Sequence, residues 1–461
     1  MDEGSLSDTQ RTMVLPLLQE TNIRGKPYIT VSAKGIVNGL SRYPNDGADF
    51  GPDTTLNATA PGQYGGTYTE TSGIQEAWNN AISVGIDYNL TLSSILAPAF
   101  YFIPEIHLLS GAFIIKKGIT FSASHLIQNF KLTGDASMSP YIVMETNDGL
   151  FTFDASTFAN TNLEIDNIAP ATASGYTPAY VIKADFSSVG QSNLFQSYNL
   201  DTGGTFQAGV ILNNFIQANF YNYQTYCPAG DQLTSVGTIN YFGGQLGGAA
   251  GTSGVTPHTY SGAITNIAFY AVNNILPVKM SSSAVTFISF YDSAIQSITL
   301  TNITCYINIF NCINAPGQTS PLITVPSSQF SVIYLLTIRG LVLGTSASIY
   351  LNDTSLLAVG DIDIKGVYPT DTLIPSLVPL IPSVPTSGTA QENTNLYSVD
   401  VYLYGGTVTE IQVTKNGTAN TYTVFSNATG IALSGQVYKL NPGDSIIVTY
   451  TTAPTWEWLS D

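Results

Sequence analysis

Residues 44–53 read Pro-Asn-Asp-Gly-Ala-Asp-Phe-Gly-Pro-Asp, and residues 71–78, after a loop rich in Gly, Thr and Tyr, read Thr-Ser-Gly-Ile-Gln-Glu-Ala-Trp. The first run has the composition of a turn. The second begins a helix that we expect over about 73–84, with Ser72 and Gln75 forming a capping box at its start. Its apolar side chains recur at helical spacing: Ile74, Ala77, Trp78, Ala81 and Ile82.

From about residue 100 to 368 the chain carries apolar runs of strand length, separated by Gly, Asn and Ser. Examples are Ala112–Ile115, Tyr141–Met144, Tyr180–Lys183, Val285–Ile288 and Ile298–Thr301. No 12-residue helical pattern alternates with them, which disfavours a doubly wound α/β fold. A long series of short strands with one amphipathic helix predicts a parallel β-helix, whose open end the helix covers.

Proline recurs every three or four residues within 371–392, which forbids a helix or a central strand and predicts an extended brace. Beyond it, strand-like runs flank Asn416-Gly417, a strong hairpin signal, and a second turn at 441–444 precedes another strand. We expect four parts: an N-terminal arm or anchor at 1–43, the β-helix at 44–370, the brace at 371–392 and a small C-terminal β-sandwich at 393–461.

Charged residues make up 10% of the chain, against roughly 25% in ordinary soluble domains. Asp and Glu number 31 and Lys and Arg 14, so the net charge is −17. Binding to nucleic acid needs clusters of Lys and Arg, and Lys116-Lys117 is the only adjacent basic pair, so we expect no nucleic-acid partner.

No apolar stretch reaches the ~20 residues of a transmembrane helix, and the N-terminus lacks the apolar region of a signal peptide. The composition suits either a hot or acidic exterior or an ordinary polar extracellular surface.

The segment 44–130 resembles the start of pectin-lyase-like proteins, in which an Asp-Gly-Ala-Asp turn, an Ile-Gln-x-Ala helix and a Leu/Gly-rich first coil open a right-handed parallel β-helix. The matching residues are Asp46–Asp49, Ile74–Ala77 and Ile106–Gly111. That superfamily includes polysaccharide lyases, glycoside hydrolases and viral tailspikes, so the resemblance implies fold more than chemistry. The C-terminal unit looks like terminal domains on surface and virion proteins of thermoacidophilic archaea and their viruses.

The expected fold is therefore all-β: a right-handed parallel β-helix of the pectin-lyase-like kind, followed by a small C-terminal β-sandwich. Together the two halves resemble a viral tailspike, spike or fibre. We expect a structural protein of the virion surface, or of the extracellular space, that contacts other virion proteins and attaches to a host-surface glycan or glycoprotein. Two alternatives stay open: a polysaccharide-degrading hydrolase or lyase on the same scaffold, and a cellular surface-layer or adhesion protein.

The aromatic and amide run Asn219–Tyr226 is the best candidate for carbohydrate binding, because rings pack on sugar faces while amides and hydroxyls bond their rims. Its candidate residues are Tyr221, Asn222, Tyr223 and Tyr226. The alternative is that alternate rings fill the β-helix core. For Trp456 and Trp458 at the C-terminal end, hydrophobic packing or an oligomer contact is favoured over ligand binding, and a homotrimer is one arrangement that they could seal.

Candidates for catalysis and metal binding are weaker. Asp361 and Asp363 share one face of an expected strand, and two carboxylates can act as acid and base on a glycosidic bond. The motifs of polygalacturonase-like hydrolases do not appear together, however, and a solvated outer face explains both residues. Three turn aspartates could bind Ca²⁺, although such residues more often accept turn N–H groups: Asp46, Asp49 and Asp53.

No cofactor is expected, and no Cys/His spacing typical of a metal site occurs. Cys227, Cys305 and Cys312 are too few for a disulfide framework, and buried thiols are favoured over a bridge. Sequons at expected turns are glycosylation candidates if a glycosylating host exports the protein: Asn57, Asn89, Asn302, Asn352 and Asn427.

Overall fold

The structure is a computed structural model, and two compact units make it up, Met1–Lys279 and Met280–Asp461. It describes residues 28–34, 36–37, 40–41, 46–84, 86–87, 100–124, 126–136, 139–155, 157–158, 161–186, 193–202, 205–247, 258–273, 275, 277–314, 322–326, 329–343, 357–368, 382–394, 398–416 and 421–460. Strands predominate in both units, and the described residues contain one helix, α3 (Ile74–Ser83).

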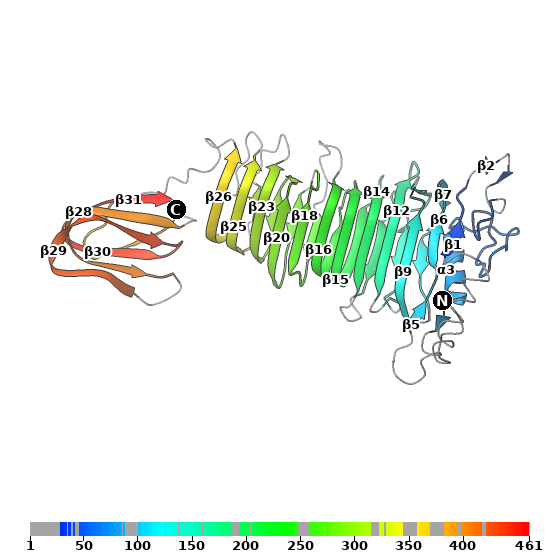
Figure 1. Ribbon diagram of the computed structural model, residues 1–461, viewed down its shortest axis with the longest axis horizontal. Helices are drawn as coiled ribbons and strands as arrows, with labels where there is room; N and C mark the ends of the chain where they lie inside the picture. The colour runs from blue at the N-terminus through cyan, green and yellow to red at the C-terminus, as the bar shows by residue number, and fades with distance from the viewer. Residues whose placement is uncertain are drawn as a thin grey trace, which may run out of the picture. The chain divides into compact units, whose positions relative to one another are not determined.

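Most strands of the first unit follow one another along the chain as successive rungs (Figure 1), whereas β2 and β3 form a separate two-stranded antiparallel sheet. They are β1 (Tyr28–Val31), β2 (Ile36–Val37), β3 (Leu40–Ser41), β4 (Ile86–Asp87), β5 (Phe100–Phe102), β6 (Glu105–Leu108), β7 (Ala112–Ile115), β8 (Ile119–Phe121), β9 (Leu126–Gly134), β10 (Tyr141–Met144), β11 (Phe151–Phe153), β12 (Asn162–Thr172), β13 (Tyr180–Asp185), β14 (Leu194–Thr202), β15 (Ala208–Thr225), β16 (Gln232–Leu246), β17 (His258–Ser261), β18 (Asn266–Tyr270) and, at the boundary, β19 (Val278–Met280).

The second unit continues this pattern and then changes to antiparallel strands. Its strands are β20 (Val285–Tyr291), β21 (Ala294–Ile295), β22 (Ile298–Leu300), β23 (Thr304–Asn314), β24 (Ile323–Thr324), β25 (Ser331–Val342), β26 (Leu357–Tyr368), β27 (Ala390–Glu392), β28 (Val399–Thr414), β29 (Thr421–Leu440), β30 (Ser445–Thr452) and β31 (Thr455–Ser460). β1 and β4–β26 belong to one 24-stranded sheet, and β27–β31 form a separate five-stranded sheet.

Parallel pairing between successive coils confirms the predicted β-helix. β12, β14, β15, β16 and β18 stack in register, so that one inward position is filled in turn by Ile165, Ser197, Phe220, Tyr241 and Phe269. Apolar side chains alternate with outward polar ones along each strand, as the period of two requires. The rings of Phe220, Tyr241 and Phe269 stack inside the coils at centroid distances of 4.5 and 5.1 Å. The sheet of the β-helix begins at Tyr28 in β1, whereas the β-helix was predicted to begin at residue 44.

A left-handed residue turns the corner of each coil after an outward side chain. Asn167, Asn199 and Asn222 have φ between 49° and 52°, a conformation that Asn tolerates better than most residues. Their side-chain amides bond from coil to coil: Asn222 Nδ2 donates to Asn199 Oδ1, and Asn199 Nδ2 to Asn167 Oδ1, each at 2.8 Å. These corners decide which side chains face outward beyond them.

Helix α3 covers the first coils through its aromatic and amide side chains. Trp78 is buried, packs against Phe121, Phe130 and Phe158, and donates from Nε1 to the carbonyl of Ser122 at 3.0 Å. This contact fits the predicted role of the helix as a cap over exposed sheet edges and apolar ends. The contact requires a large aromatic side chain, Trp78, on the apolar face of the helix.

The predicted capping box at the start of α3 is wrong. The N-cap residue is Gly73, at φ 86°, and it makes no side-chain cap bond. A β-carbon there would lie 2.6 Å from the backbone nitrogen of Gly51, so close approach of the chain requires glycine. Ser72 and Gln75 instead bond the backbones of Ile114 and Thr120. Ser72 and Gln75 therefore bond the backbone of neighbouring strands, whereas in an isolated helix they would bond the N–H groups of the helix itself.

The C-terminal domain is the predicted β-sandwich, built from one antiparallel sheet folded into two layers (Figure 1). β28 pairs with β29 along its length, with β31 through its first half and with β30 through its second half. The fold line runs through left-handed glycines, Gly405 and Gly406 on β28 and Gly430 and Gly435 on β29, where side chains would be strained. The predicted turn at 441–444 connects β29 to β30, whereas Gly417 and Thr418 of the turn predicted at 415–418 lie outside the described residues.

Trp456 and Trp458 lie inside this sandwich. They are 5% and 1% exposed and pack edge-to-face at 5.7 Å within the core. Trp456 Nε1 donates to the carbonyl of Pro382 at 2.8 Å, and the hydroxyl of Tyr450 donates to that of Pro385 at 2.7 Å. Hydrophobic packing, the favoured interpretation, therefore holds for both tryptophans, and neither is available to seal an oligomer. Residues 371–381 of the expected brace lie outside the described residues, whereas its end packs on the sandwich.

Candidate functional site

An aromatic ladder runs along the outer face of β14, β15, β16 and β18. The ladder consists of Tyr198, Tyr221, Phe242 and Tyr270, which share one register position on successive coils. Neighbouring ring centroids lie 4.6, 4.9 and 5.1 Å apart, and their planes are within 10° of parallel. Because strands of a sheet lie about 4.8 Å apart, one outward ring per coil is enough to build a continuous stack.

Because the rings of the ladder stack face to face, it is their edges and hydroxyls that point to solvent. Tyr270 is 38% exposed and the other three rings are half-buried. At the β14 end, among the described ring pairs on this outer face, Tyr198 stacks only with Tyr221. The residue opposite Tyr198 on β12 is Asp166, which is shorter than a ring. One face of Tyr198 therefore adjoins a carboxylate rather than another ring.

A row of side-chain amides lies beside the ladder. Gln196, Asn219 and Asn240 precede the ladder residues by two positions and are in register with one another. Asn219 Oδ1 accepts hydrogen bonds of 2.9 Å from Asn240 Nδ2 and from Gln217 Nε2. Since residues i and i+2 face the same side of a strand, amides and rings share one outward face, on which Asn219 itself is only 7% exposed.

Charged side chains of β9 and β12 adjoin the Tyr198 end of this surface. Lys131 Nζ lies 2.9 Å from Glu164 Oε1, and this hydrogen bond is the main reason that the pKa of Lys131 is raised. Burial, and then the negative charge of Glu164, raise the pKa of Asp166 above its ordinary value. Asp166 Oδ1 is buried without a hydrogen-bond partner among the described residues. Two neighbouring carboxylates thus have different environments, which is how proteins separate acid and base roles.

Two of the four predicted carbohydrate-binding residues lie on or beside this surface. Tyr221 is a ladder ring, and Asn222 is the exposed corner residue that follows it. Tyr223 is fully buried, so its prediction as a glycan contact is corrected: the left-handed corner at Asn222 reverses the alternation and turns Tyr223 inward. Tyr226 is half-buried beyond the corner, with its hydroxyl 3.4 Å from the side-chain carbonyls of Gln224 and Gln245.

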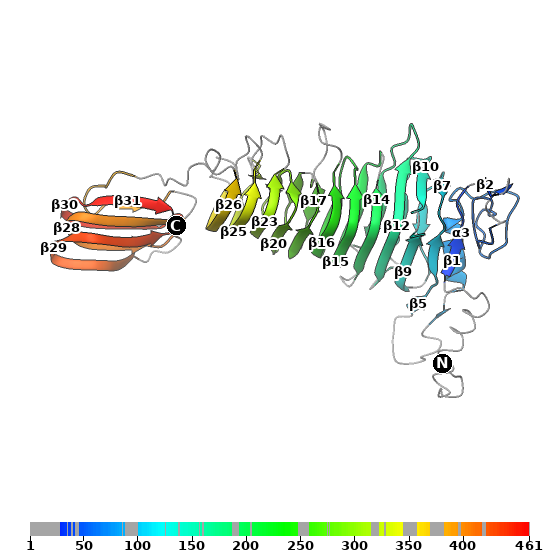
Figure 2. The ribbon, with the colours of Figure 1, turned by 45° about the horizontal axis from the view of Figure 1, so that its top comes forward.

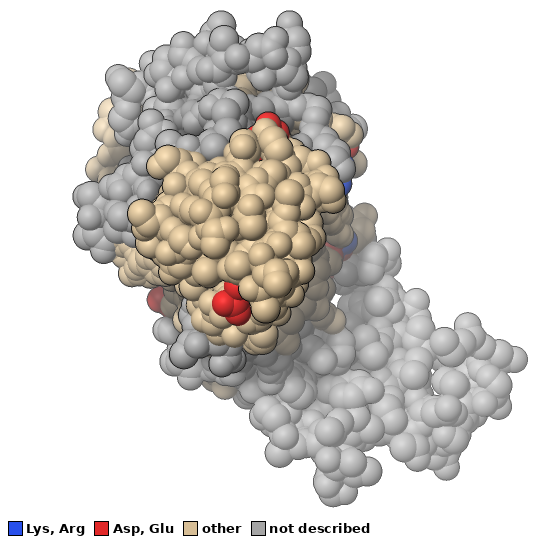
Figure 3. Space-filling view, turned by 90° about the vertical axis from the view of Figure 1, so that its left-hand side faces the viewer, with Lys and Arg blue, Asp and Glu red and all other residues tan. Residues whose placement is uncertain are grey.

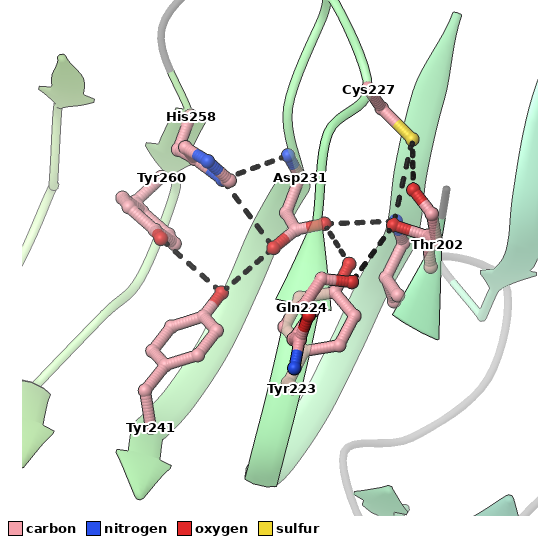
Figure 4. Close-up of polar contacts among 9 residues, drawn as sticks. Thr202, Tyr223, Gln224, Cys227, Asp231, Tyr241, His258 and Tyr260 are labelled. Carbon is pink, nitrogen blue, oxygen red and sulfur yellow. Dashed lines mark hydrogen bonds and ion pairs between the residues drawn. The ribbon is translucent and has the colours of Figure 1, made fainter. Parts of the chain in front are cut away.

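Tyr223 belongs to a buried polar cluster around Asp231 (Figure 4). The Asp231 carboxylate accepts hydrogen bonds from the hydroxyl of Tyr223 at 2.7 Å, the backbone N–H of Val210 at 3.0 Å and the hydroxyl of Tyr241 at 3.2 Å. The backbone N–H of Asp231 donates to Nδ1 of His258 at 3.0 Å. The side chains of Asp231, His258 and both tyrosines have no exposed surface.

This Asp231 cluster ties coils together and has no access for a substrate. Burial raises the pKa of Tyr223 and of Tyr241 well above the ordinary value, so both remain hydrogen-bond donors. A β-carbon on Gly209 would lie 2.5 Å from Asp231 Oδ1, so the backbone closes directly over the carboxylate. General acid–base chemistry requires a substrate within hydrogen-bond reach. The cluster instead links β15, β16 and the start of β17, where His258 lies.

The predicted catalytic pair Asp361 and Asp363 falls on β26. The side chain of Asp361 lies outside the described residues, and the Asp363 carboxylate is paired with Arg339 of the neighbouring β25. Among the described carboxylates, Glu164 and Asp166 are the ones that adjoin the aromatic ladder.

The turn aspartates accept hydrogen bonds from the backbone. Asp46 Oδ1 accepts from the N–H of Ala48 at 3.1 Å, and Asp49 Oδ2 accepts from the N–H and hydroxyl of Thr30, both at 2.9 Å. Within the described ranges, no group of three or more His, Cys, Asp or Glu is placed to hold a metal ion. The structure does not assemble Asp46, Asp49 and Asp53 into the Ca²⁺ site considered above.

The glycosylation candidates divide by position. Asn57 and Asn302 are exposed at left-handed turn positions, and Asn427 is half-buried, with its side-chain carbonyl accepting bonds from Thr429. Asn89 and Asn352 lie outside the described residues. Glycosylation of the three described sites remains a prediction.

Sequence reasoning missed the ladder as a unit and the carboxylates at its end. A signal was present: at each corner an aromatic residue precedes Asn, Gly or Ala, as in Tyr198-Asn199, Tyr221-Asn222, Phe242-Gly243 and Tyr270-Ala271. The intervals between these pairs are unequal, because connections of different length leave the coils. A search for a fixed repeat therefore does not find them.

No protein-family model matches the chain, and no curated protein matches its sequence. Among solved structures, the chain is similar to the enzymatically active domain of tailspike protein 4 of bacteriophage CBA120, at 9% identity and a TM-score of 0.30, over 90% of this chain and 72% of that one. A likeness at this TM-score carries no argument about function. No helix among the described residues is long and apolar enough to span a membrane.

Proposed function

We propose that the protein is a virion-surface spike or fibre that attaches to a host-surface glycan through the aromatic ladder and the amide row. The observation that supports this proposal is the placement of four rings and three amides on one outward face. The outward edges of the stacked rings offer apolar surface to the C–H groups of sugars, and amides and tyrosine hydroxyls bond sugar hydroxyls. The parallel β-helix provides the rigid scaffold on which such a surface is held in place.

The electrostatics of this surface favour a neutral, hydroxyl-rich glycan. Lys131, the described cation that adjoins it, is already paired with Glu164. Asp166 and Glu164 place negative charge beside Tyr198, and the whole chain carries −17. A polyanionic glycan would be repelled, whereas carboxylates can accept hydrogen bonds from the paired hydroxyls of a neutral sugar.

Glycan-array binding by the purified chain tests the attachment function. Tyr198→Ala removes the ring at the β14 end of the ladder, and we expect at least tenfold weaker binding to the glycan that the wild type selects. Phe287→Ala is the matched control, since Phe287 is a 49% exposed ring stacked on Tyr306 in the second unit. No binding to any glycan, together with absence of the chain from purified virions by mass spectrometry, would refute the proposal.

A second candidate function, hydrolysis of the bound glycan, is favoured by the two carboxylates at the end of the ladder. Asp166 would donate its proton to the glycosidic oxygen as the C1–O bond breaks, and Glu164 would take a proton from the water that attacks C1. The raised pKa of Asp166 suits an acid, and Glu164 lies two residues before it on the same strand. Release of reducing ends that Asp166→Asn abolishes, with glycan binding retained, would establish this activity.

A further inference from the structure

Strand β29 forms a long edge of the C-terminal sandwich. It spans Thr421–Leu440 and pairs with β28 on one side. Among the described residues, no strand pairs with its other side, and Figure 2 shows it along the lower border of the sandwich. An edge strand presents a row of unpaired backbone N–H and C=O groups, which is a template for a further strand.

The core of the sandwich opens along the same edge. Tyr422 is in register with Val413, and Ile431 with Val408, so each of these pairs lies on the same side of the sheet. Val413 and Val408 belong to the buried core, whereas Tyr422 is 52% exposed and Ile431 41% exposed. Apolar side chains that face the core are therefore only partly covered on this side.

The opposite side of the sandwich is closed. There β27 pairs with β30, and the preceding segment bonds Trp456 and Tyr450 through the carbonyls of Pro382 and Pro385. The same domain thus covers one edge of its sheet with its own chain and leaves the β29 edge uncovered by described residues.

The near absence of charged residues on β29 indicates which partner can pair with its edge. Natural edge strands are usually protected by charged residues or proline, yet β29 contains no proline and one charged residue, Lys439, near its end. At the end of the sandwich that Figure 3 faces, nearly all described atoms likewise belong to uncharged residues. Two copies of a chain that carries −17 repel each other on most surfaces. A neutral edge is where two such copies can approach without that repulsion.

We propose that β29 is a self-association edge, and that two copies of this chain pair β29 to β29 as antiparallel strands about a twofold axis. Such an isologous contact uses the same patch on both copies and closes at two. Up to the left-handed Gly430, the segment 421–429 of each strand satisfies free backbone groups of the other, and each copy covers Tyr422 and the adjoining Ile431 of its partner. This contact concerns the sandwich alone and does not depend on the glycan-binding proposal.

Light scattering and sedimentation of the full chain across a micromolar concentration series test the contact. We expect the wild type to reach twice the chain mass of 49.1 kDa. Tyr422→Lys and Ile431→Lys each place a charge on the edge, and we expect each to raise the dissociation constant at least tenfold. Leu459→Lys is the matched control, because Leu459 is a 51% exposed apolar residue on β31, and it should leave the mass unchanged.

A measurement on the wild type keeps the test independent of variant folding. Hydrogen–deuterium exchange in peptides covering 421–440 should slow as protein concentration rises, while exchange in β30 stays constant because both of its sides are paired. A wild type that stays monomeric at every concentration would overturn the proposal. So would an oligomer whose mass all three lysine variants leave unchanged, or exchange in β29 that is independent of concentration.

Discussion

The hydroxyl of Tyr223 donates a 2.7 Å hydrogen bond to the carboxylate of Asp231 inside the coils, where neither side chain has any exposed surface. Two residues earlier on the same strand, Tyr221 lies outside and stacks on Tyr198. One left-handed residue, Asn222, separates an outward-facing ring from a buried one. The corner thus assigns each tyrosine its environment.

The Asp231 carboxylate should be essential for stability rather than for binding. Asp231→Ala removes an acceptor from two tyrosine hydroxyls and the Val210 N–H, and should lower the free energy of unfolding by about 3–5 kcal/mol. Tyr223→Phe removes one hydroxyl and should cost about 1–3 kcal/mol, because Asp231 loses one of its donors. Thermal unfolding at a fixed scan rate measures both. Equal midpoints for wild type and Asp231→Ala would contradict this assignment.

The aromatic anchor of α3 should hold the first coils. Trp78→Ala leaves a cavity among Phe121, Phe130 and Phe158 and should destabilise that region by about 3–5 kcal/mol. Hydrogen exchange resolved by peptide should show faster exchange in β8 and β9, which carry Phe121 and Phe130. Tyr68→Ala, at a residue 55% exposed in the preceding loop, serves as control and should change exchange there little.

Asp444 should make the stability of the sandwich depend on acid pH. Burial raises its pKa, but the hydrogen bond from Lys415 and the N–H groups of Asn416 and Asn441 outweigh it, so the pKa lies below its ordinary value. A depressed folded-state pKa stabilises the fold above the unfolded pKa of about 3.9, and that stabilisation is lost as pH falls through the folded pKa.

Fluorescence of Trp456 and Trp458 in a Trp78→Phe background reports on this domain alone, since the chain has three tryptophans. Denaturant unfolding should show wild-type stability falling below about pH 4. Asp444→Asn should be less stable by about 2–3 kcal/mol at pH 7 and nearly independent of pH in the acid range. A variant that keeps the wild-type acid dependence would show that another carboxylate is responsible.

The three thiols should be unreactive in the folded chain. Cys227, Cys305 and Cys312 are free and buried, and burial raises their pKa to about 11, 12 and 11. Because the thiolate is the reactive form, iodoacetamide at pH 8 should modify none of them, whereas the denatured chain should take up three labels. Mass spectrometry counts the labels, and modification of the native chain would contradict the buried positions.

Local sequence patterns predict some elements here and not others. The Asn-Gly signal at 416–417 correctly predicts that β28 and β29 pair as antiparallel strands, and the Pro-Gly turn at 442–443 correctly separates β29 from β30, because such backbone preferences act over four residues. The capping box at Ser72 failed because strand backbones compete for the same side chains. The ladder was found only at Tyr221, since the other rings come from coils with different spacings along the chain.

By itself, the sequence determined the class of fold: strand-length apolar runs without intervening helices can bury their apolar faces only by stacking on one another, and a single amphipathic helix can only cover the end. Tertiary structure alone decided which residues meet. Stacking places side chains from separate coils about 4.8 Å apart, and each left-handed corner resets which of them point outward. The ladder, the carboxylates beside Tyr198 and the open edge of β29 all arise from that arrangement in space.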